Sequence, residues 1–142
     1  MDEKISRISS FLSPEAQEIL EQLLSKSDVK IQQAIKSVAN ISDADAAAIL
    51  EAMNSSMISE TTIAKELMKS FLLFAQQRTE LTNDTLSYLQ SLSGSQINLG
   101  CISYIAEYAN KMNKKVEILD IASKWDKNKQ GLKIGIEKIL EK

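Results

Sequence analysis

The side chains that could carry out chemistry are few, because the 142 residues include no histidine and only one cysteine. Without histidine the chain has no Ser-His-Asp or Cys-His catalysis, no imidazole base and no histidine-ligated zinc or haem. Cys101 falls on the apolar stripe of a predicted helix and has no cation near it in sequence. We therefore interpret Cys101 as a small buried hydrophobic residue and not as a nucleophile.

The carboxylates offer no close acid–base pair. Asp43 and Asp45 are two residues apart, so on a helix they face different directions, and they complement the helix dipole instead. Glu15, Glu18 and Glu21 recur every three residues, which is typical of a solvated helix face; binding of a basic partner is the less favoured alternative. The four glycines have neither dinucleotide nor P-loop spacing. We expect that the protein is not an enzyme.

Residues 126–137 contain the one local motif with metal-binding character. Their sequence, Asp-Lys-Asn-Lys-Gln-Gly and then Glu137, resembles the calcium-binding loop of the EF-hand, with an acid at position one, Asn at three, Gly at six and Glu at twelve. Gln130 replaces the usual acid or Asn at position five, and lysines crowd a site that should be negative. A polar turn beside a helix explains the same residues, so we expect no metal and no cofactor.

Charge is distributed unevenly along the chain, whose net charge is −2. From Lys111 onward nine lysines outnumber five acids, which gives +4, so the remainder carries −6. The basic part contains no arginine and lacks the planar guanidinium that recognises phosphates and bases. We expect a solvated lysine surface and no nucleic-acid partner.

The sequence also bears on location. One cysteine excludes an internal disulfide and suits a reducing compartment. The N-terminal residues lack the pattern of a signal peptide, and the longest apolar run, 71–75, is far too short to cross a bilayer. We expect a cytoplasmic protein without a membrane span.

The scaffold that positions these side chains is predicted to be helical. The chain contains only one proline, four glycines and 5% aromatic residues, and residues that favour helices make up much of the rest. The longest predicted helix covers 59–78, where Ile63, Leu67, Phe71 and Phe74 form one apolar stripe. From Phe71 to Ala75 that helix is apolar on all sides, so other segments should cover it.

Further helices are predicted on both sides of this central one. They begin at Ser13, Ser27 and Ser42, each a suitable N-cap, and cover 82–92 and 97–112 later in the chain. The connections between them are short, which favours steep or antiparallel packing of neighbouring helices.

The last thirty residues allow two structures. Val116 to Trp125 and Leu132 to Leu140 have apolar spacing that fits helices, but parts of both runs also alternate as strands do. We favour helices and keep a C-terminal hairpin as the minority alternative. The predicted fold is therefore all-α: residues 1–142 form one compact single-domain bundle of seven to eight short helices around 59–78.

Residues 1–12 form a predicted amphipathic N-terminal arm. Ile5, Ile8, Phe11 and Leu12 make its apolar face. We expect the arm to dock on its own domain, and docking on a partner is the alternative.

Residues 42–53 are similar to one unit of the armadillo-like helical repeats of bacterial magnesium-transporter and flagellar-motor proteins. The similarity covers a dozen residues of low complexity. The chain shows no convincing internal repeat, and we assign no family.

Two functional hypotheses follow. The first is a non-enzymatic protein–protein interaction or regulatory module, whose interface with a partner or a second copy includes Ile5, Ile8 and Phe11. The alternative is a carrier or sensor of an apolar small molecule in a haem-free, globin-like bundle. Its predicted pocket is lined by Met68, Phe71, Phe74 and Cys101.

Overall fold

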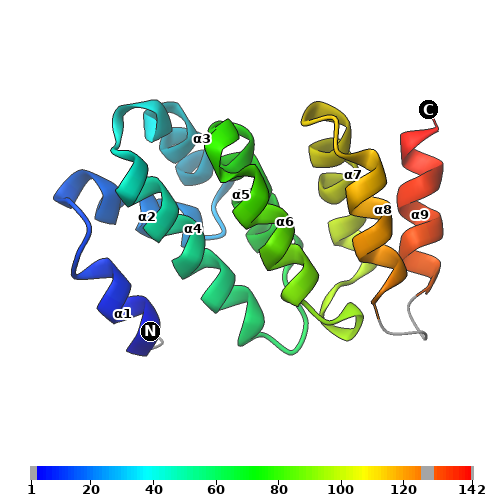
Figure 1. Cartoon of the computed structure of the whole chain (residues 1–142). Helices are drawn as coiled ribbons and strands as arrows, with labels where there is room; N and C mark the ends of the chain where they lie inside the picture. Colours follow the sequence, from blue (N-terminus) through cyan, green and yellow to red (C-terminus); the bar gives the residue numbers. More distant parts are fainter. Residues whose placement is uncertain (1–2, 126–129, 142) are drawn as a thin grey trace.

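Helices make up all the regular secondary structure in residues 3–125 and 130–141, which the structure, a computed structural model, describes (Figure 1). This confirms the all-α prediction, with nine α-helices in these ranges where we expected seven or eight. Four 3-10 turns join some of them: η1 (Val38–Asn40), η2 (Thr79–Leu81), η3 (Gly94–Gln96) and η4 (Leu99–Cys101). The helices are α1 (Glu3–Ser9), α2 (Pro14–Leu24), α3 (Asp28–Ser37), α4 (Asp43–Ile58), α5 (Lys65–Gln76), α6 (Thr82–Ser91), α7 (Ile102–Lys111), α8 (Lys115–Ser123) and α9 (Gln130–Leu140).

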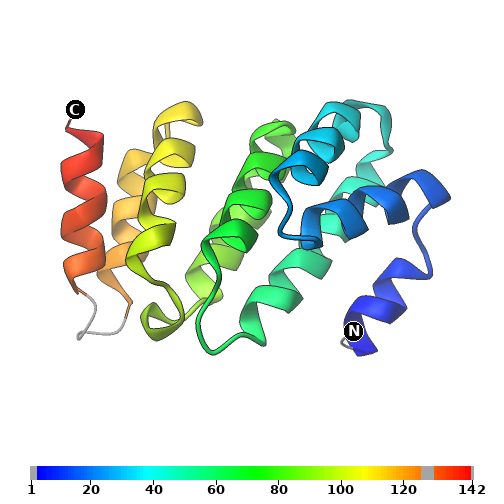
Figure 2. The ribbon, with the colours of Figure 1, turned by 180° about the vertical axis from the view of Figure 1, so that it is seen from behind.

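The helices stack side by side in two layers, and the N- and C-terminal helices lie at opposite ends of the array (Figures 1 and 2). One layer contains α4, α6 and α8, and the other contains α3, α5 and α7. Helices two apart in the chain are neighbours within a layer, since α5 contacts both α3 and α7, and α6 contacts α8. α9 packs on α7 and α8 at the C-terminal end. Stacked helix-repeat proteins use the same layered principle.

α5 occupies the centre of this array, as predicted. It contacts α2, α3 and α4 toward the N-terminal end and α6 and α7 toward the C-terminal end. Its side chains Met68, Phe71 and Phe74 are completely buried. Burial of such side chains supplies roughly 1.5–3 kcal/mol each before the entropic cost of ordering them, so this helix organises the core.

The predicted limits of the central helix, 59–78, are wrong. The helix covers only Lys65–Gln76, and α4 with 16 residues is longer. Residues 59–64 connect the two helices instead, because the backbone of Ile63 is bonded elsewhere: its N–H donates to Gln96 O at 2.7 Å, and its carbonyl accepts from Asn98 Nδ2 at 2.8 Å. The Ile63 side chain is still buried, as its spacing predicted.

The serine N-caps are confirmed. The hydroxyl oxygens of Ser13, Ser27 and Ser42 accept the backbone N–H groups three residues later, at 3.2, 3.4 and 3.1 Å. Pro14 occupies the first turn of α2, where its missing N–H costs nothing. The beginnings of α2, α3 and α4 are thus fixed by local chemistry.

The C-terminal segments are helical, so the hairpin alternative is wrong. Val116 lies in α8, and Leu132 to Ile136 lie in α9. Leu132 and Ile136 are buried, which places them on one helical face and not on alternating faces of a strand. Gly135 allows a close approach of α9 to α7, because a Cβ atom there would lie 2.6 Å from Ile102 Cδ1.

The N-terminal arm docks on its own domain, as expected. α1 packs along α4, Leu12 is buried, and Ile8 packs against the core. No helix in the described ranges has the length and apolar character needed to cross a bilayer.

The side chain of Gln96 links the end of α4 to the connection before α7. Its Nε2 group donates to the carbonyls of Ile58 and Glu60 at 2.9 Å each, and to that of Met57 at 3.4 Å. Its Oε1 atom accepts the Ser93 N–H at 3.0 Å. One side chain therefore binds the last carbonyl of α4 and the carbonyl of Glu60, and holds the connection before α7 against them.

Replacing Gln96 with alanine should lower the free energy of unfolding by about 2 kcal/mol, because the carbonyls of Ile58 and Glu60 lose their donor. Urea unfolding followed by circular dichroism measures this change. The matched control is Gln90→Ala, on the exposed face of α6, which should stay within about 0.5 kcal/mol of the unmodified protein. Equal effects of the two substitutions would contradict the clamping role of Gln96.

Candidate interaction site

Phe11 is the most exposed large apolar side chain in the described part of the chain. It follows α1, and 83% of its surface is accessible, whereas Leu12 beside it is 6% exposed. The predicted interface of Ile5, Ile8 and Phe11 is therefore divided: Ile8 packs on the core and Phe11 points to solvent. The side chain of Ile5 lies outside the described residues.

The backbone around Phe11 is held on both sides. Its own N–H donates to Ile8 O at 3.1 Å, and the Leu12 carbonyl accepts from Gln17 Nε2 at 3.0 Å. Ser13 Oγ donates to Asp45 Oδ2 at 3.0 Å, which ties this turn to the start of α4. The aromatic ring is thus presented by a fixed turn, which reduces the entropy lost when it binds.

The four residues of the predicted apolar pocket are all completely buried. Met68, Phe71 and Phe74 project from α5, and Cys101 lies in η4, which contacts α5. The cavities described below are lined by other residues. The pocket therefore stays a prediction, and no observation favours the carrier hypothesis.

Cys101 behaves as a core residue. Its Sγ atom lies 3.6 Å from Ile63 O and 3.8 Å from Asn98 Oδ1, distances of weak thiol hydrogen bonds. Burial raises the pKa of the Cys101 thiol. A higher pKa and a closed environment both oppose nucleophilic chemistry, in agreement with the sequence interpretation.

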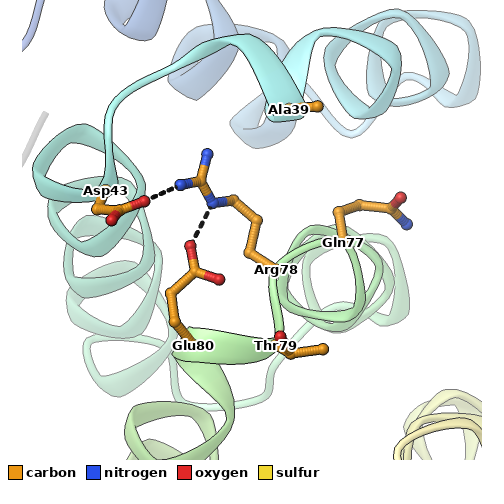
Figure 3. A pocket seen from close by; sticks show the side chains of 6 residues that line it. All are labelled: Ala39, Asp43, Gln77, Arg78, Thr79 and Glu80. Carbon is orange, nitrogen blue, oxygen red and sulfur yellow. Dashed lines mark hydrogen bonds and ion pairs between the residues drawn. The ribbon is translucent and has the colours of Figure 1, made fainter.

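Arg78 forms a polar joint that the sequence did not reveal. Its Nη1 atom donates to Val38 O at 3.1 Å and to Ile41 O at 2.8 Å. Its Nε atom donates to Glu80 Oε1 at 2.6 Å, and its Nη2 atom pairs with the Asp43 carboxylate (Figure 3). Because the side chain is only 11% exposed and most of its donors are occupied, Arg78 links α5 to the connection before α4.

The joint borders an open cavity of about 470 Å³. In Figure 3, Gln77 extends away from the ion pairs, and the carboxylates of Asp43 and Glu80 bond directly to the Arg78 guanidinium. Bonding to Glu80 raises the pKa of Arg78, and the same bond lowers the pKa of Glu80. The two carboxylates outnumber the single guanidinium and leave a net charge of −1, which argues for a structural role and against anion binding.

Asp43 and Asp45 face different ways, as predicted. Asp43 pairs with Arg78, and Asp45 accepts from Ser13. Both lie in the first turn of α4, where the helix dipole favours them. Their tertiary partners are 35 and 32 residues away in the chain, which no local spacing could indicate.

A smaller cavity lies among α7, the start of α8 and the end of α9. Its volume is about 160 Å³. Ala106, Ile139 and Leu140 supply apolar lining, and its polar lining comes from Ser103, Glu107, Asn110 and Lys115. A hollow of about 230 Å³ between α2 and α3 has polar and charged lining. Another of about 390 Å³ lies on α3 beside the exposed Val29 and has a mainly apolar lining surface.

Within the part of the chain that the structure describes, the charged segments form no cluster of metal-binding side chains. Glu15, Glu18 and Glu21 are exposed along α2, as expected for a solvated face. Among the C-terminal lysines, three form ion pairs within their own helices or turns: Lys114 with Glu117 at 3.3 Å, Lys124 with Asp120 at 3.2 Å, and Lys133 with Glu137 at 3.7 Å.

The motif of residues 126–137 falls partly outside the described residues, which omit 126–129. From Gln130 onward the chain is helical, whereas an EF-hand loop turns sharply at its glycine, here Gly131. Glu137 pairs with a lysine on the same helix. No group of three or more His, Cys, Asp or Glu residues in the described ranges is placed to hold a metal ion.

Comparisons with known proteins add no assignment. No protein-family model, no curated protein and no solved structure matches this chain.

Substitution of Arg78 by methionine should destabilise the fold by about 2 kcal/mol, because two backbone carbonyls lose their donor. Chemical unfolding measures this loss. The matched substitution Lys36→Met removes a cation from the exposed face of α3 and should have little effect. A near-neutral Arg78→Met variant would show that the joint is dispensable.

Stability should also depend on pH through Glu80. Since the folded pKa of Glu80 is lowered by Arg78, its contribution is present above the ordinary carboxyl value of 4.5 and is lost as the pH falls through the lowered value. Between about pH 5 and pH 3, the unfolding midpoint of the Glu80→Gln variant should therefore fall by less than the midpoint of the unmodified protein. Glu21→Gln on α2 controls for the change in net charge. Parallel pH profiles for Glu80→Gln and the unmodified protein would contradict this coupling.

Proposed function

We propose that the protein is a non-enzymatic interaction module of regulatory type that contacts its partner through Phe11. The observation that carries this proposal is an aromatic ring 83% exposed on a turn whose backbone is hydrogen-bonded on both sides. Aromatic side chains are enriched among the residues that dominate binding energy, and a fixed turn presents the ring without further ordering.

The layered array supports the proposal. Stacked helices expose long ridged surfaces and keep a continuous core, so binding residues at one end can vary without disturbing the fold. Phe11 is free to bind a partner without affecting the fold, because its neighbours Ile8 and Leu12 supply the contacts that dock α1. Removing the ring leaves those contacts in place.

The Phe11→Ala variant should keep the stability of the unmodified protein and lose its partner. Both forms serve as bait for proteins from the native host and for an untagged copy of the chain, with quantitative mass spectrometry of what is retained. A partner that contacts Phe11 should be retained roughly tenfold less by the variant.

The matched control is Leu99→Ala, because Leu99 is also well exposed, at 71%, but lies in η4. It should retain the partner normally. If the two variants and the unmodified protein retain the same proteins in the same amounts, Phe11 is not the contact and the proposal fails.

A further inference from the structure

We propose that the cavity among α7, α8 and α9 binds a free α-amino acid with an aliphatic side chain. The Glu107 carboxylate receives the ammonium group of the ligand, Lys115 binds its carboxylate, and the apolar wall of the cavity receives its side chain. This inference goes beyond the proposed function, because α9 and the turn after α1 that carries Phe11 lie at opposite ends of the array (Figures 1 and 2).

The two charged groups at this cavity have opposite sign and are unpaired. Glu107 and Lys115 both line the cavity and are exposed. Within residues 3–125 and 130–141, neither side chain forms a hydrogen bond or an ion pair with another residue. The pKa of Lys69 is raised mainly by its bond to Asp28 and only slightly by Glu107. Both charges at the cavity are therefore available to a ligand that carries the complementary pair.

The other cavities lack this combination. Beside Arg78 the carboxylates already bond to the guanidinium, so the charges there are occupied. The hollow between α2 and α3 has charges of both signs, but only polar and charged side chains line it. The hollow on α3 has an apolar surface beside Val29, but its one acid, Asp28, is paired with Lys69.

The size and lining of the cavity suit an amino acid such as leucine. Its volume is about 160 Å³, and Ala106, Ile139 and Leu140 provide the apolar wall. An aliphatic protein cavity of roughly 150 Å³ holds benzene, and the isobutyl side chain of leucine is smaller than benzene. The lining is more polar than apolar, with Ser103 and Asn110 beside the charged groups. A polar rim over an apolar wall suits a ligand with two charged ends and excludes a purely apolar one.

An NMR titration of the isotope-labelled, unmodified protein with L-leucine tests the proposal. The backbone amide signals of Ala106, Asn110 and Leu140 should shift in a saturable way, with half-saturation near about 1 mM, as expected for a small ligand with few contacts. Isocaproate lacks the ammonium group, and isopentylamine lacks the carboxylate. Each should bind roughly tenfold more weakly than leucine, because one charge-assisted contact is lost. Glycine, which lacks the aliphatic side chain, should also bind roughly tenfold more weakly.

Two variants locate the two charged contacts. Lys115→Met should bind leucine roughly tenfold more weakly and bind isopentylamine, which has no carboxylate, as before. Glu107→Gln should likewise weaken leucine and leave isocaproate unaffected. A merely structural change would weaken the paired ligands alike. The matched controls are Lys111→Met, at an exposed position of α7, and Glu21→Gln on α2, which should bind leucine as the unmodified protein does.

Three results would overturn the inference. They are the absence of saturable shifts up to about 10 mM leucine, equal affinity for leucine and its two analogues, and an equal loss of leucine and isopentylamine in Lys115→Met. These titrations involve no protein partner, and Phe11→Ala should bind leucine normally. Their failure therefore leaves the proposed function standing, and failure of the Phe11 retention experiment leaves this site standing.

Discussion

The burial of most of α5 constrains the rest of the molecule. A helix whose second half is apolar all round cannot sit on a surface, so helices from both halves of the chain must pack against it. Two layers with α5 in the middle of one of them meet this requirement. As a consequence, the two ends of α5 lie where the chain enters and leaves the core. Long-range polar contacts complete both ends: Asn98 bonds the Ile63 carbonyl before α5, and Arg78, directly after α5, bonds two distant carbonyls.

The hydrogen-bond networks of Gln96 and Arg78 have different chemistry because their surroundings differ. Gln96 is neutral, and its amide both donates and accepts, which suits a helix end where carbonyls are to be satisfied beside an N–H. Arg78 faces two carbonyls and two carboxylates, a set of acceptors that only a guanidinium could bridge with a single side chain. Neither arrangement resembles a catalytic site, since the groups in each already bind one another. Among the large apolar side chains in the described ranges, Phe11 is the most exposed.

Local chemistry made much of the fold predictable from the sequence. Serine caps located the beginnings of three helices, and the spacing around Phe71 identified the central helix. The limits of that helix were not predictable, because the groups that bind the backbone of Ile63 lie more than thirty residues away. Phe11 shares a helical face with Ile8 by spacing, but α1 ends at Ser9, so the next turn directs the two side chains differently. The cavity among α7, α8 and α9 depends on three segments at once, and periodicity within one segment contains no information about it.

The placement of α1 and α9 at opposite ends of the array has a consequence for measuring its motion. In a stack of helices, small rotations between neighbours add up along the stack, so the distance between the two extremities is the quantity most sensitive to bending. A fluorophore on each extremity would turn that curvature into an energy-transfer signal. Cys101 is buried, so cysteines introduced on the surface could be labelled while the native thiol stays protected.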